Sequence, residues 1–508
     1  MIVNKTVILV FFIILKFTLH WFLIAPGFDL HRDEYLHLDQ AKHLAWGFES
    51  VPPFTSWISF IILKAGSPVW LIKFFPALFG ALTMLVVWKT IELLKGNLFA
   101  LVLGAIAVTL SVILRMNILY QPNSFDILCW TALYYYITRY INDGNSSWLY
   151  YAACVFGIGF LNKYNIIFLV AGLVPALLIT ELRKIFLNRN LYFAIATGLL
   201  IISPNLIWQY QNNFPVIGHM QELTDTQLVN VNRMDFIKEQ LLFFTGSIFI
   251  ILAAFISFFI YPEFKKYRIL FYSYIFTIFL FIYFKGKGYY AIGLYPIFLA
   301  FGSVYLERLL QHKPFYYLRI VMLFITTGLS VPLLMFAFPL YTPEKTALRA
   351  PMYKKLGMLK WEDGNEHALP QDFADMLGWK ELAAKTDNVF TSIKGDENTL
   401  VLCDNYGQAG AINFYSKQNL QAVSFNADYI NWFDFSRTYN KIILVKENED
   451  PDPMREEEKK YFKNIITKGK VENKLARESG TTIFLLDSPT TQINEILKEE
   501  IINRKKNK

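Results

Sequence analysis

Long apolar runs separated by short polar segments fill the first two thirds of the chain. A helix crosses the hydrocarbon core of a bilayer with about 20 mainly apolar residues. Runs of this kind lie near residues 7–24, 72–94, 98–115, 124–141, 148–161, 164–181, 191–208, 237–261, 269–284, 289–307 and 318–340. The fifth and sixth are short and are joined by Asn162-Lys163-Tyr164, so they form either one broken helix or two short spans. The pattern predicts a polytopic α-helical membrane protein with about 11 (11–13) transmembrane helices.

Beyond residue 340 the pattern changes to that of a mixed α/β domain. Helical periodicity occurs at 372–385, 407–416, 455–467 and 491–503, and strand-like runs occur at Thr399–Cys403, Lys441–Lys446 and Thr481–Leu486. Tyr406-Gly407-Gln408 follows the first strand without the G-x-G-x-x-G spacing, which favours a tight strand-to-helix turn over a nucleotide loop. We therefore divide the chain into a membrane domain, residues 1–340, and an α/β domain, residues 341–508.

The loop between the first two apolar runs, residues 27–70, is unusually long. Within it Tyr35, Leu38, Leu44 and Trp46 recur with near-helical spacing, which predicts an amphipathic helix on the membrane surface. Pro52-Pro53 ends this helix, and residues 54–63 predict a second short helix along the surface.

The distribution of charge supports the division into two parts. Residues 1–340 hold 24 Lys and Arg and 15 Asp and Glu, whereas the remaining residues hold 25 and 26. The share of charged residues in the first part lies far below the ~25% of a soluble domain, and the share in the second part lies slightly above it. The chain is therefore neither wholly soluble nor wholly embedded. Its net charge of +8 comes from the apolar part, which indicates membrane topology and not nucleic-acid binding.

Lysine and arginine in the short loops predict the orientation. With the N-terminus in the cytoplasm, 13 of them fall in short inside turns and about 10 in longer outside segments. The first run has no cleavage site after it and is expected to stay as the first membrane helix. Eleven spans then place the charged tail outside. The three cysteines exclude a disulfide framework, and no spacing indicates a zinc site.

Two acidic places stand at the predicted outer membrane boundary, where a charge facing protein is a functional candidate. Asp33-Glu34 follows the first helix, and the pair either favours the dipole of a helix start or forms a reactive site. Asp126 falls in the first turn of the fourth helix, after a chain break at Pro122-Asn123. Arg115, at the other end of that turn, is its expected counter-ion.

Basic residues mark two further places on the same side. Lys163 lies in the tight turn between the fifth and sixth runs and either snorkels to the interface or binds an anion. Lys285 and Lys287 are spaced by glycines that let the backbone approach an anion, and Tyr290 follows them. Lysines on an outside loop oppose the topology rule, which favours a phosphate-binding role.

Several of these segments, in this order, resemble those of a known family. They are HRDEYLHLDQAKHLAWGFESVPPF, YQPNSFDILCW, GFLNKYN and KGKGYYAIGLYP, with DMLGWKELAAK and NYGQAGAINFY in the tail. The chain resembles glycosyltransferase family 39, the polytopic dolichyl-phosphate-mannose protein mannosyltransferase type, and the related lipid A aminoarabinose transferases. The resemblance runs from the first loop to about residue 440 and implies the GT-C fold with a C-terminal extracytoplasmic α/β domain.

The resemblance also implies an activity: inverting transfer of a sugar from a polyprenyl-phosphate carrier to an acceptor in the cell envelope. In that reading Asp33 is the general base, and Glu34 and Asp126 orient Asp33 and the acceptor or hold a divalent cation. No other cofactor is expected. The donor phosphate would be bound by basic and phenolic side chains, namely Lys163, Lys285, Lys287, Arg115 and Tyr290.

The acceptor can be a lipid, a glycan or a protein, and the sugar a hexose or a pentose. The expected location is the inner membrane of a bacterium, with the site and the C-terminal domain on the extracytoplasmic face. A transporter or flippase of a lipid-linked anion is the alternative, although no inverted repeat is found. A non-catalytic scaffold would leave the four charged places unexplained. The C-terminal domain either caps the site or recruits the acceptor.

Overall fold

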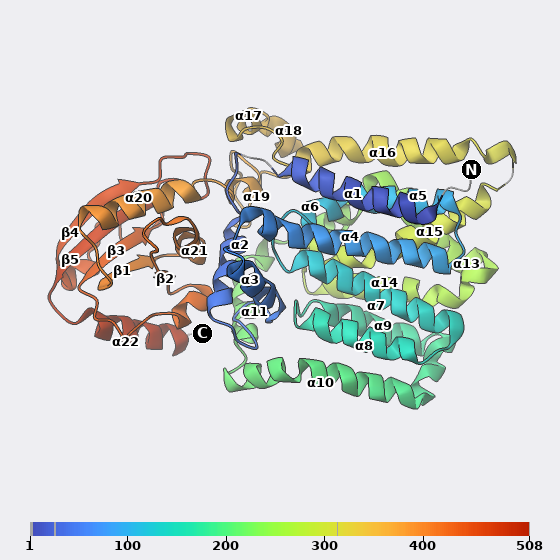
Figure 1. The fold of residues 1–508 in the computed structure, drawn as a ribbon, viewed down its shortest axis with the longest axis horizontal. Helices are drawn as coiled ribbons and strands as arrows, with labels where there is room; N and C mark the ends of the chain where they lie inside the picture. The colour runs from blue at the N-terminus through green and yellow to red at the C-terminus, as the bar shows by residue number, and fades with distance from the viewer. Residues whose placement is uncertain (1–3, 25–26, 312, 507–508) are drawn as a thin grey trace.

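A bundle of long helices and a smaller α/β domain lie end to end along the molecule (Figure 1). The computed structural model describes residues 4–24, 27–311 and 313–506. The helices of the bundle run roughly along the long axis of the view, with the orange and red C-terminal domain at one end (Figure 1). The fold confirms the expected fold class, a mainly helical protein with a small C-terminal sheet domain.

Each of the eleven apolar runs contains a helix. The bundle helices are α1 (Lys5–Leu23), α4 (Val69–Leu93), α5 (Leu98–Thr109), α7 (Asn123–Asp143), α8 (Ser147–Phe160), α9 (Ile166–Leu178), α10 (Arg189–Gln211), α13 (Ile248–Ile260), α14 (Arg268–Tyr283), α15 (Pro296–Leu309) and α16 (Leu318–Ala337). The fifth and sixth runs form two separate helices, α8 and α9.

Length and composition identify candidate membrane spans among these helices. Within the described residues, five helices are long and apolar enough to cross a membrane on their own, and three bent helix pairs extend this to as many as eight. Shorter apolar helices such as α5 and α8 fall below that length. The number of 11 spans therefore stays a prediction.

The long first loop forms two helices, as predicted, but the first ends at Asp39 and not at Pro52-Pro53, and it faces protein. These helices are α2 (Arg32–Asp39) and α3 (Phe54–Lys64). Tyr35 is 1% exposed and Leu38 is buried, because the aromatic rings of Trp379 and Phe414 from the C-terminal domain cover this side of α2. The expected contact of these two residues with the membrane surface is wrong. Leu44 and Trp46, beyond the end of α2, are exposed.

Further short helices stand at the domain end of the bundle or connect the two parts. They are α6 (Val112–Met116), α11 (Pro215–Thr226), α12 (Arg233–Leu242), α17 (Pro343–Ala347), α18 (Ala350–Lys355) and α19 (Gln371–Ala374).

A five-stranded mixed sheet forms the core of the C-terminal domain. Its order is β2-β1-β3-β5-β4, with β2, β1 and β3 parallel and β5 antiparallel to both neighbours. The strands are β1 (Thr399–Cys403), β2 (Ala422–Ser424), β3 (Lys441–Lys446), β4 (Phe462–Lys470) and β5 (Thr482–Pro489), and the helices are α20 (Trp379–Ser392), α21 (Tyr406–Tyr415) and α22 (Ile493–Lys506).

The sequence patterns of this domain are largely confirmed, with two errors. The helix expected at 372–385 is broken, because residues 375–378 form a turn between α19 and α20 in which Gly378 is left-handed, with φ of 84°. β1 and β3 have the predicted bounds, and the strand-to-helix turn after β1 leads into α21. The helix expected at 455–467 is wrong, because most of its second half belongs to β4. This strand pairs with β5 along one edge only, so its exposed side chains do not show the apolar alternation of a buried strand.

Candidate active site

The Asp33 carboxylate lies at the end of the bundle that meets the C-terminal domain. The His31 side chain caps the start of α2 by accepting a hydrogen bond from the Asp33 backbone N–H at 3.2 Å. Asp33 Oδ1 accepts a hydrogen bond from the Tyr406 hydroxyl at 2.6 Å, and Oδ2 accepts one from the Gln121 amide at 3.0 Å. The side chain of Asp33 remains 36% exposed. It is therefore held in place yet open to a reacting group.

Its surroundings keep Asp33 ionised. Burial by itself would raise the pKa of this carboxyl, but the charges of His31 and Arg32 and the hydrogen bond from Tyr406 outweigh burial and lower the pKa to about 2. Asp33 is consequently a carboxylate at any pH near neutrality.

Glu34 has different surroundings from its neighbour. It is fully buried, and its carboxylate accepts hydrogen bonds from the Lys73 ammonium at 2.6 and 2.8 Å. The backbone N–H groups of His31 and Tyr120 donate two more, at 2.7 and 2.6 Å. Glu34 thus closes a capping box at the start of α2 and joins α2 to α4 and to the turn before α7. This geometry supports a role in holding α2, the helix that carries Asp33.

A chain of amide groups connects Asp33 with Lys163. The Gln121 amide that binds Asp33 accepts, through its own Oε1, a hydrogen bond from the Asn123 amide at 3.0 Å. Asn123 Oδ1 in turn accepts one from the Lys163 ammonium at 2.7 Å. The structure therefore connects the candidate base on α2 with a candidate phosphate-binding lysine in the turn between α8 and α9.

Asp126 lies on α7, one helical turn after Asn123. It is buried in the first turn of α7, and its oxygens accept hydrogen bonds from Trp130 at 2.9 Å and Asn165 at 3.2 Å. Its cationic neighbour is Lys163. The expected pairing with Arg115 is wrong, because the Arg115 guanidinium forms its ion pair with Asp372 at 3.1 Å.

The basic residues are distributed unevenly around this centre. Lys163 lies 4.7 Å from the ring centroid of Tyr290 and 5.3 Å from that of Tyr289. Burial, together with the charge of Lys287, lowers the pKa of Lys163 to about 8, although Asp126 opposes this shift. Lys163 is thus a cation whose proton is unusually easy to remove.

The glycine-spaced lysines differ from each other. The Lys287 ammonium forms a short ion pair with Glu362 and donates to Gln227 at 2.6 Å. The charge of Glu362 outweighs burial and raises the pKa of Lys287. Lys285 has a left-handed backbone conformation, with φ of 53°. The Lys285 backbone N–H donates to the Ile282 carbonyl at 3.4 Å, and in the part of the chain that the structure describes the Lys285 side chain has no hydrogen-bond or ion-pair partner.

Arg115 lines a cavity of about 430 Å³ beside this centre. Tyr289, Glu239 and apolar side chains of α16 also line it, among them Leu333 and Leu334. Arg115 itself is 5% exposed, and its Nη1 has no hydrogen-bond partner among residues 4–24, 27–311 and 313–506. The cavity therefore combines a long apolar wall with a buried cation.

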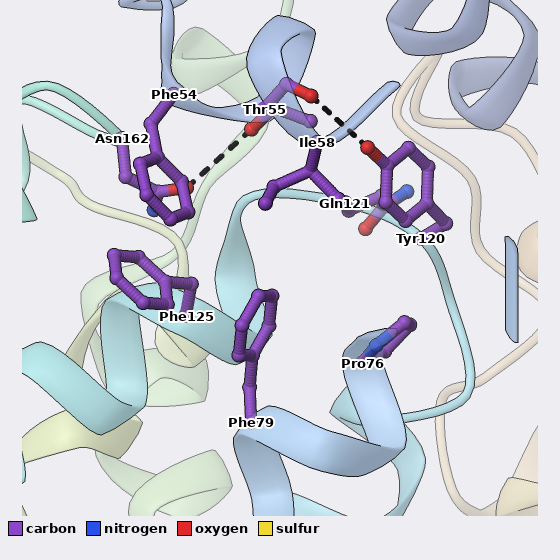
Figure 2. A pocket seen from close by; sticks show the side chains of 9 residues that line it. All are labelled: Phe54, Thr55, Ile58, Pro76, Phe79, Tyr120, Gln121, Phe125 and Asn162. Atoms are coloured by element: carbon purple, nitrogen blue, oxygen red, sulfur yellow. Dashed lines mark hydrogen bonds between the residues drawn. The ribbon is translucent and has the colours of Figure 1, made fainter. Parts of the chain in front are cut away.

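A second, much smaller hollow lies next to Gln121 (Figure 2). The rings of Phe54 and Phe125 stack there at a centroid distance of 4.1 Å, and Phe79 meets Phe125 edge-on at 4.8 Å. The site thus borders an apolar, aromatic surface on the side of α3 and α4.

The structure does not group the acidic residues as a shared metal site. Among the described residues, no three His, Cys, Asp or Glu side chains converge in a way that could hold a metal ion. A divalent metal at Asp33, Glu34 and Asp126 stays a prediction.

Several residues that contact the predicted site lay outside the set expected from the sequence. Gln121 and Asn123 belong to the segment YQPNSFDILCW, so their closeness to Asp126 in sequence was the available signal. Tyr406 and Glu362 come from the C-terminal part, and no local pattern indicates that they reach Asp33 and Lys287.

Known proteins resemble this chain in sequence and in fold. Residues 50–208 match the family model described as dolichyl-phosphate-mannose-protein mannosyltransferase. Lipid A galacturonosyltransferase RgtD of Rhizobium johnstonii is 25% identical over 232 residues, which cover 43% of this chain and 47% of that protein. The match therefore spans about half the length of this relative.

Two crystal structures of ArnT from Cupriavidus metallidurans share the architecture. The apo structure superposes with a TM-score of 0.63 at 12% identity, and the structure bound to undecaprenyl phosphate with 0.61 at 13%. Each comparison covers 95% of this chain and 98% of ArnT. The chain has the GT-C fold. The matches together confirm the resemblance to GT-C glycosyltransferases and to enzymes that modify lipid A.

Proposed function

We propose that the GT-C chain is a membrane glycosyltransferase that moves a sugar from a polyprenyl-phosphate carrier to an acceptor in the cell envelope. The observation that carries this proposal is the hydrogen-bonded chain Asp33–Gln121–Asn123–Lys163. This chain of hydrogen bonds supports the proposal, because an inverting transfer needs a carboxylate to take the acceptor proton and a cation to stabilise the leaving phosphate.

The chemistry follows from the two charges. The acceptor hydroxyl attacks the anomeric carbon while the bond from that carbon to the phosphate oxygen breaks, and the configuration inverts. Asp33 takes the hydroxyl proton, and Lys163 stabilises the charge that grows on the leaving phosphate. Since the pKa of Asp33 is about 2, the proton moves to it only as the new C–O bond forms.

The cavity beside Arg115 supports the nature of the donor. A polyprenyl phosphate needs a long apolar surface next to a cation, and the wall formed by α16 together with Arg115 offers both. Lys285 is available to bind the same phosphate, with Lys287 and Tyr290 nearby on the same loop. The relatives guide the choice of substrates: undecaprenyl phosphate as the first carrier and a lipid A-type molecule as the first acceptor.

The loop charges support a bacterial inner-membrane location with this site on the extracytoplasmic face. The helix α2, which carries Asp33, lies at the end of the bundle where the C-terminal domain is attached (Figure 1).

The test is an assay in membranes that contain the full chain. Undecaprenyl-phosphate sugars, hexoses and pentoses, each labelled in the sugar, are added and the labelled products identified. We expect label in an envelope acceptor, with at least a thousandfold loss in Asp33→Asn. The matched control is Asp235→Asn, whose carboxylate is exposed and pairs only with Lys238 in the described structure. Label that crosses the bilayer while still on its carrier would support a transporter and overturn the proposal.

A further inference from the structure

One side chain of the C-terminal domain reaches the candidate base. The Tyr406 hydroxyl and the Gln121 amide donate to opposite oxygens of the Asp33 carboxylate, at 2.6 and 3.0 Å. We propose that Tyr406 is a positioning residue for the transfer reaction, and that the active site is complete only with the C-terminal domain docked on α2. This inference rests on the proposed function, since it concerns the orientation of its base.

The position of Tyr406 is fixed by the start of α21. Asn405 caps that helix through a hydrogen bond from the Gln408 N–H at 2.9 Å, and its amide donates to Glu447 and Glu478. The Tyr406 N–H donates to Asn426 at 3.3 Å. The first residue of the helix therefore has little freedom, and its side chain is directed at Asp33.

Two glycines let α21 lie directly on α2. A Cβ atom at Gly410 would come within 2.6 Å of the Tyr35 Cβ atom, and one at Gly407 within 3.3 Å of the Arg32 Cβ atom. Both neighbours belong to α2, the helix that carries Asp33. Because neither glycine carries a side chain, α21 can approach α2 closely at these two positions, which brings Tyr406 near Asp33.

Polar contacts along α2 hold the same arrangement. Asp39 accepts hydrogen bonds from the Tyr429 hydroxyl and the Asn413 amide, both at 2.7 Å. At the other end, Asp29 accepts one from the Trp379 N–H at 3.1 Å and pairs with Lys380 at 2.9 Å. The domain thus forms a fixed wall of the site.

The chemistry of Tyr406 suits a hydrogen-bond donor. Its ring lies under the Arg32 guanidinium at 4.5 Å. Burial and the charge of Asp33 raise the pKa of Tyr406 well above its usual range, despite the opposing charge of Arg32. The hydroxyl therefore keeps its proton and offers it to Asp33, which fixes the carboxylate plane while leaving other lone pairs open to the acceptor.

The test compares Tyr406→Phe with Tyr415→Phe in the membrane assay. Tyr415 lies on the same helix and in the same interface, where its hydroxyl contacts Leu30 N and Tyr35, not Asp33. For Tyr406→Phe we expect kcat to fall at least tenfold with donor KM within about twofold. The acid limb of kcat/KM moves to higher pH, because Asp33 loses a donor that favours its charged form. Tyr415→Phe keeps the wild-type rate and profile.

Several outcomes decide the question. A Tyr406→Phe protein with unchanged kcat, or with a lower rate and an unmoved acid limb, overturns the positioning role. If that variant does not fold, Tyr406→His, which retains a ring N–H donor, must keep more activity than Tyr406→Ala for the role to stand. The proposed function is tested separately. If the wild-type protein transfers sugar and Asp33→Asn does not, the proposed function stands whatever Tyr406→Phe does. If the wild-type protein shows no transfer, the proposed function itself is overturned.

Discussion

The Lys163 ammonium donates a hydrogen bond to Asn123 Oδ1 at 2.7 Å, although Asn123 begins α7 and Lys163 lies in the turn between α8 and α9. Through Gln121 this contact continues to Asp33. The group proposed to meet the leaving phosphate and the group proposed to take the acceptor proton are thus oriented by one set of amides. A change at either end alters the orientation of the other.

The first prediction concerns the amide that binds Asp33. Gln121→Glu replaces an N–H donor with a carboxylate of the same shape, so it repels Asp33 and raises the pKa of that carboxyl. We expect kcat to fall at least tenfold and the acid limb of kcat/KM to move upward. The measurement is a pH series of initial rates, with Gln211→Glu, an exposed position at the end of α10, as the control. If the rate and its pH dependence were the same in Gln121→Glu and in the wild-type protein, Gln121 would have no role in orienting Asp33.

The second prediction concerns the basic limb of the pH profile. Transfer needs Asp33 deprotonated and Lys163 protonated, and the pKa of Lys163 in the free protein is lowered to about 8. The value of kcat/KM should therefore fall as pH rises through about 8. Lys163→Arg, whose guanidinium stays charged, should remove this limb even if the rate itself is lower. A basic limb that persists at the same pH in Lys163→Arg would refute the assignment.

The third prediction concerns the ion pair between Lys287 and Glu362. A donor phosphate that binds Lys287 must compete with this carboxylate and with Gln227. Glu362→Gln should lower the donor KM several-fold, whereas Lys287→Gln should raise it about tenfold or more. Lys354→Gln, from the exposed pair with Glu366, is the control. If Glu362→Gln raised the donor KM, Glu362 would be holding Lys287 ready for the phosphate and not competing with it.

The fourth prediction concerns stability. Lys73 is 6% exposed and its partner Glu34 is fully buried, so Lys73→Ala leaves a buried carboxylate without its cation. This should cost about 3–5 kcal/mol of unfolding free energy. Thermal unfolding in detergent measures the change against Lys238→Ala, whose pair with Asp235 is exposed and should matter little. Equal midpoints for the two variants would contradict a structural role for the Glu34–Lys73 pair.

Periodicity predicted most of the fold because bundle helices and buried strands bury regular apolar faces. The bounds of β1 and β3 and the helix in every apolar run follow from that rule. Tyr35 and Leu38 show what periodicity cannot predict. Their helical spacing was visible, but whether lipid or protein covers them depends on a domain more than 300 positions away.

Part of the candidate site could also be predicted from the sequence. Asp33, Asp126 and the lysines stand out because charge at a membrane boundary is expensive. Tyr406 does not, since a tyrosine in an amphipathic helix is ordinary and its partner lies in another domain. The sequence also does not distinguish the surroundings of Asp33 from those of Glu34. Only the fold shows that Asp33 is partly exposed and that Glu34 is buried against Lys73.

The four residues from Tyr120 to Asn123, which lead into α7 and form its first position, have a consequence for chain length. Tyr120 N–H binds Glu34, Gln121 binds Asp33, the Pro122 carbonyl binds Asn162, and Asn123 binds Lys163. Deleting one residue would shift those that follow by about 3.8 Å, so most of these contacts would be lost together. A single substitution in this segment removes one of these contacts, whereas a change in its length removes most of them, so an indel here should be far more damaging than any single substitution.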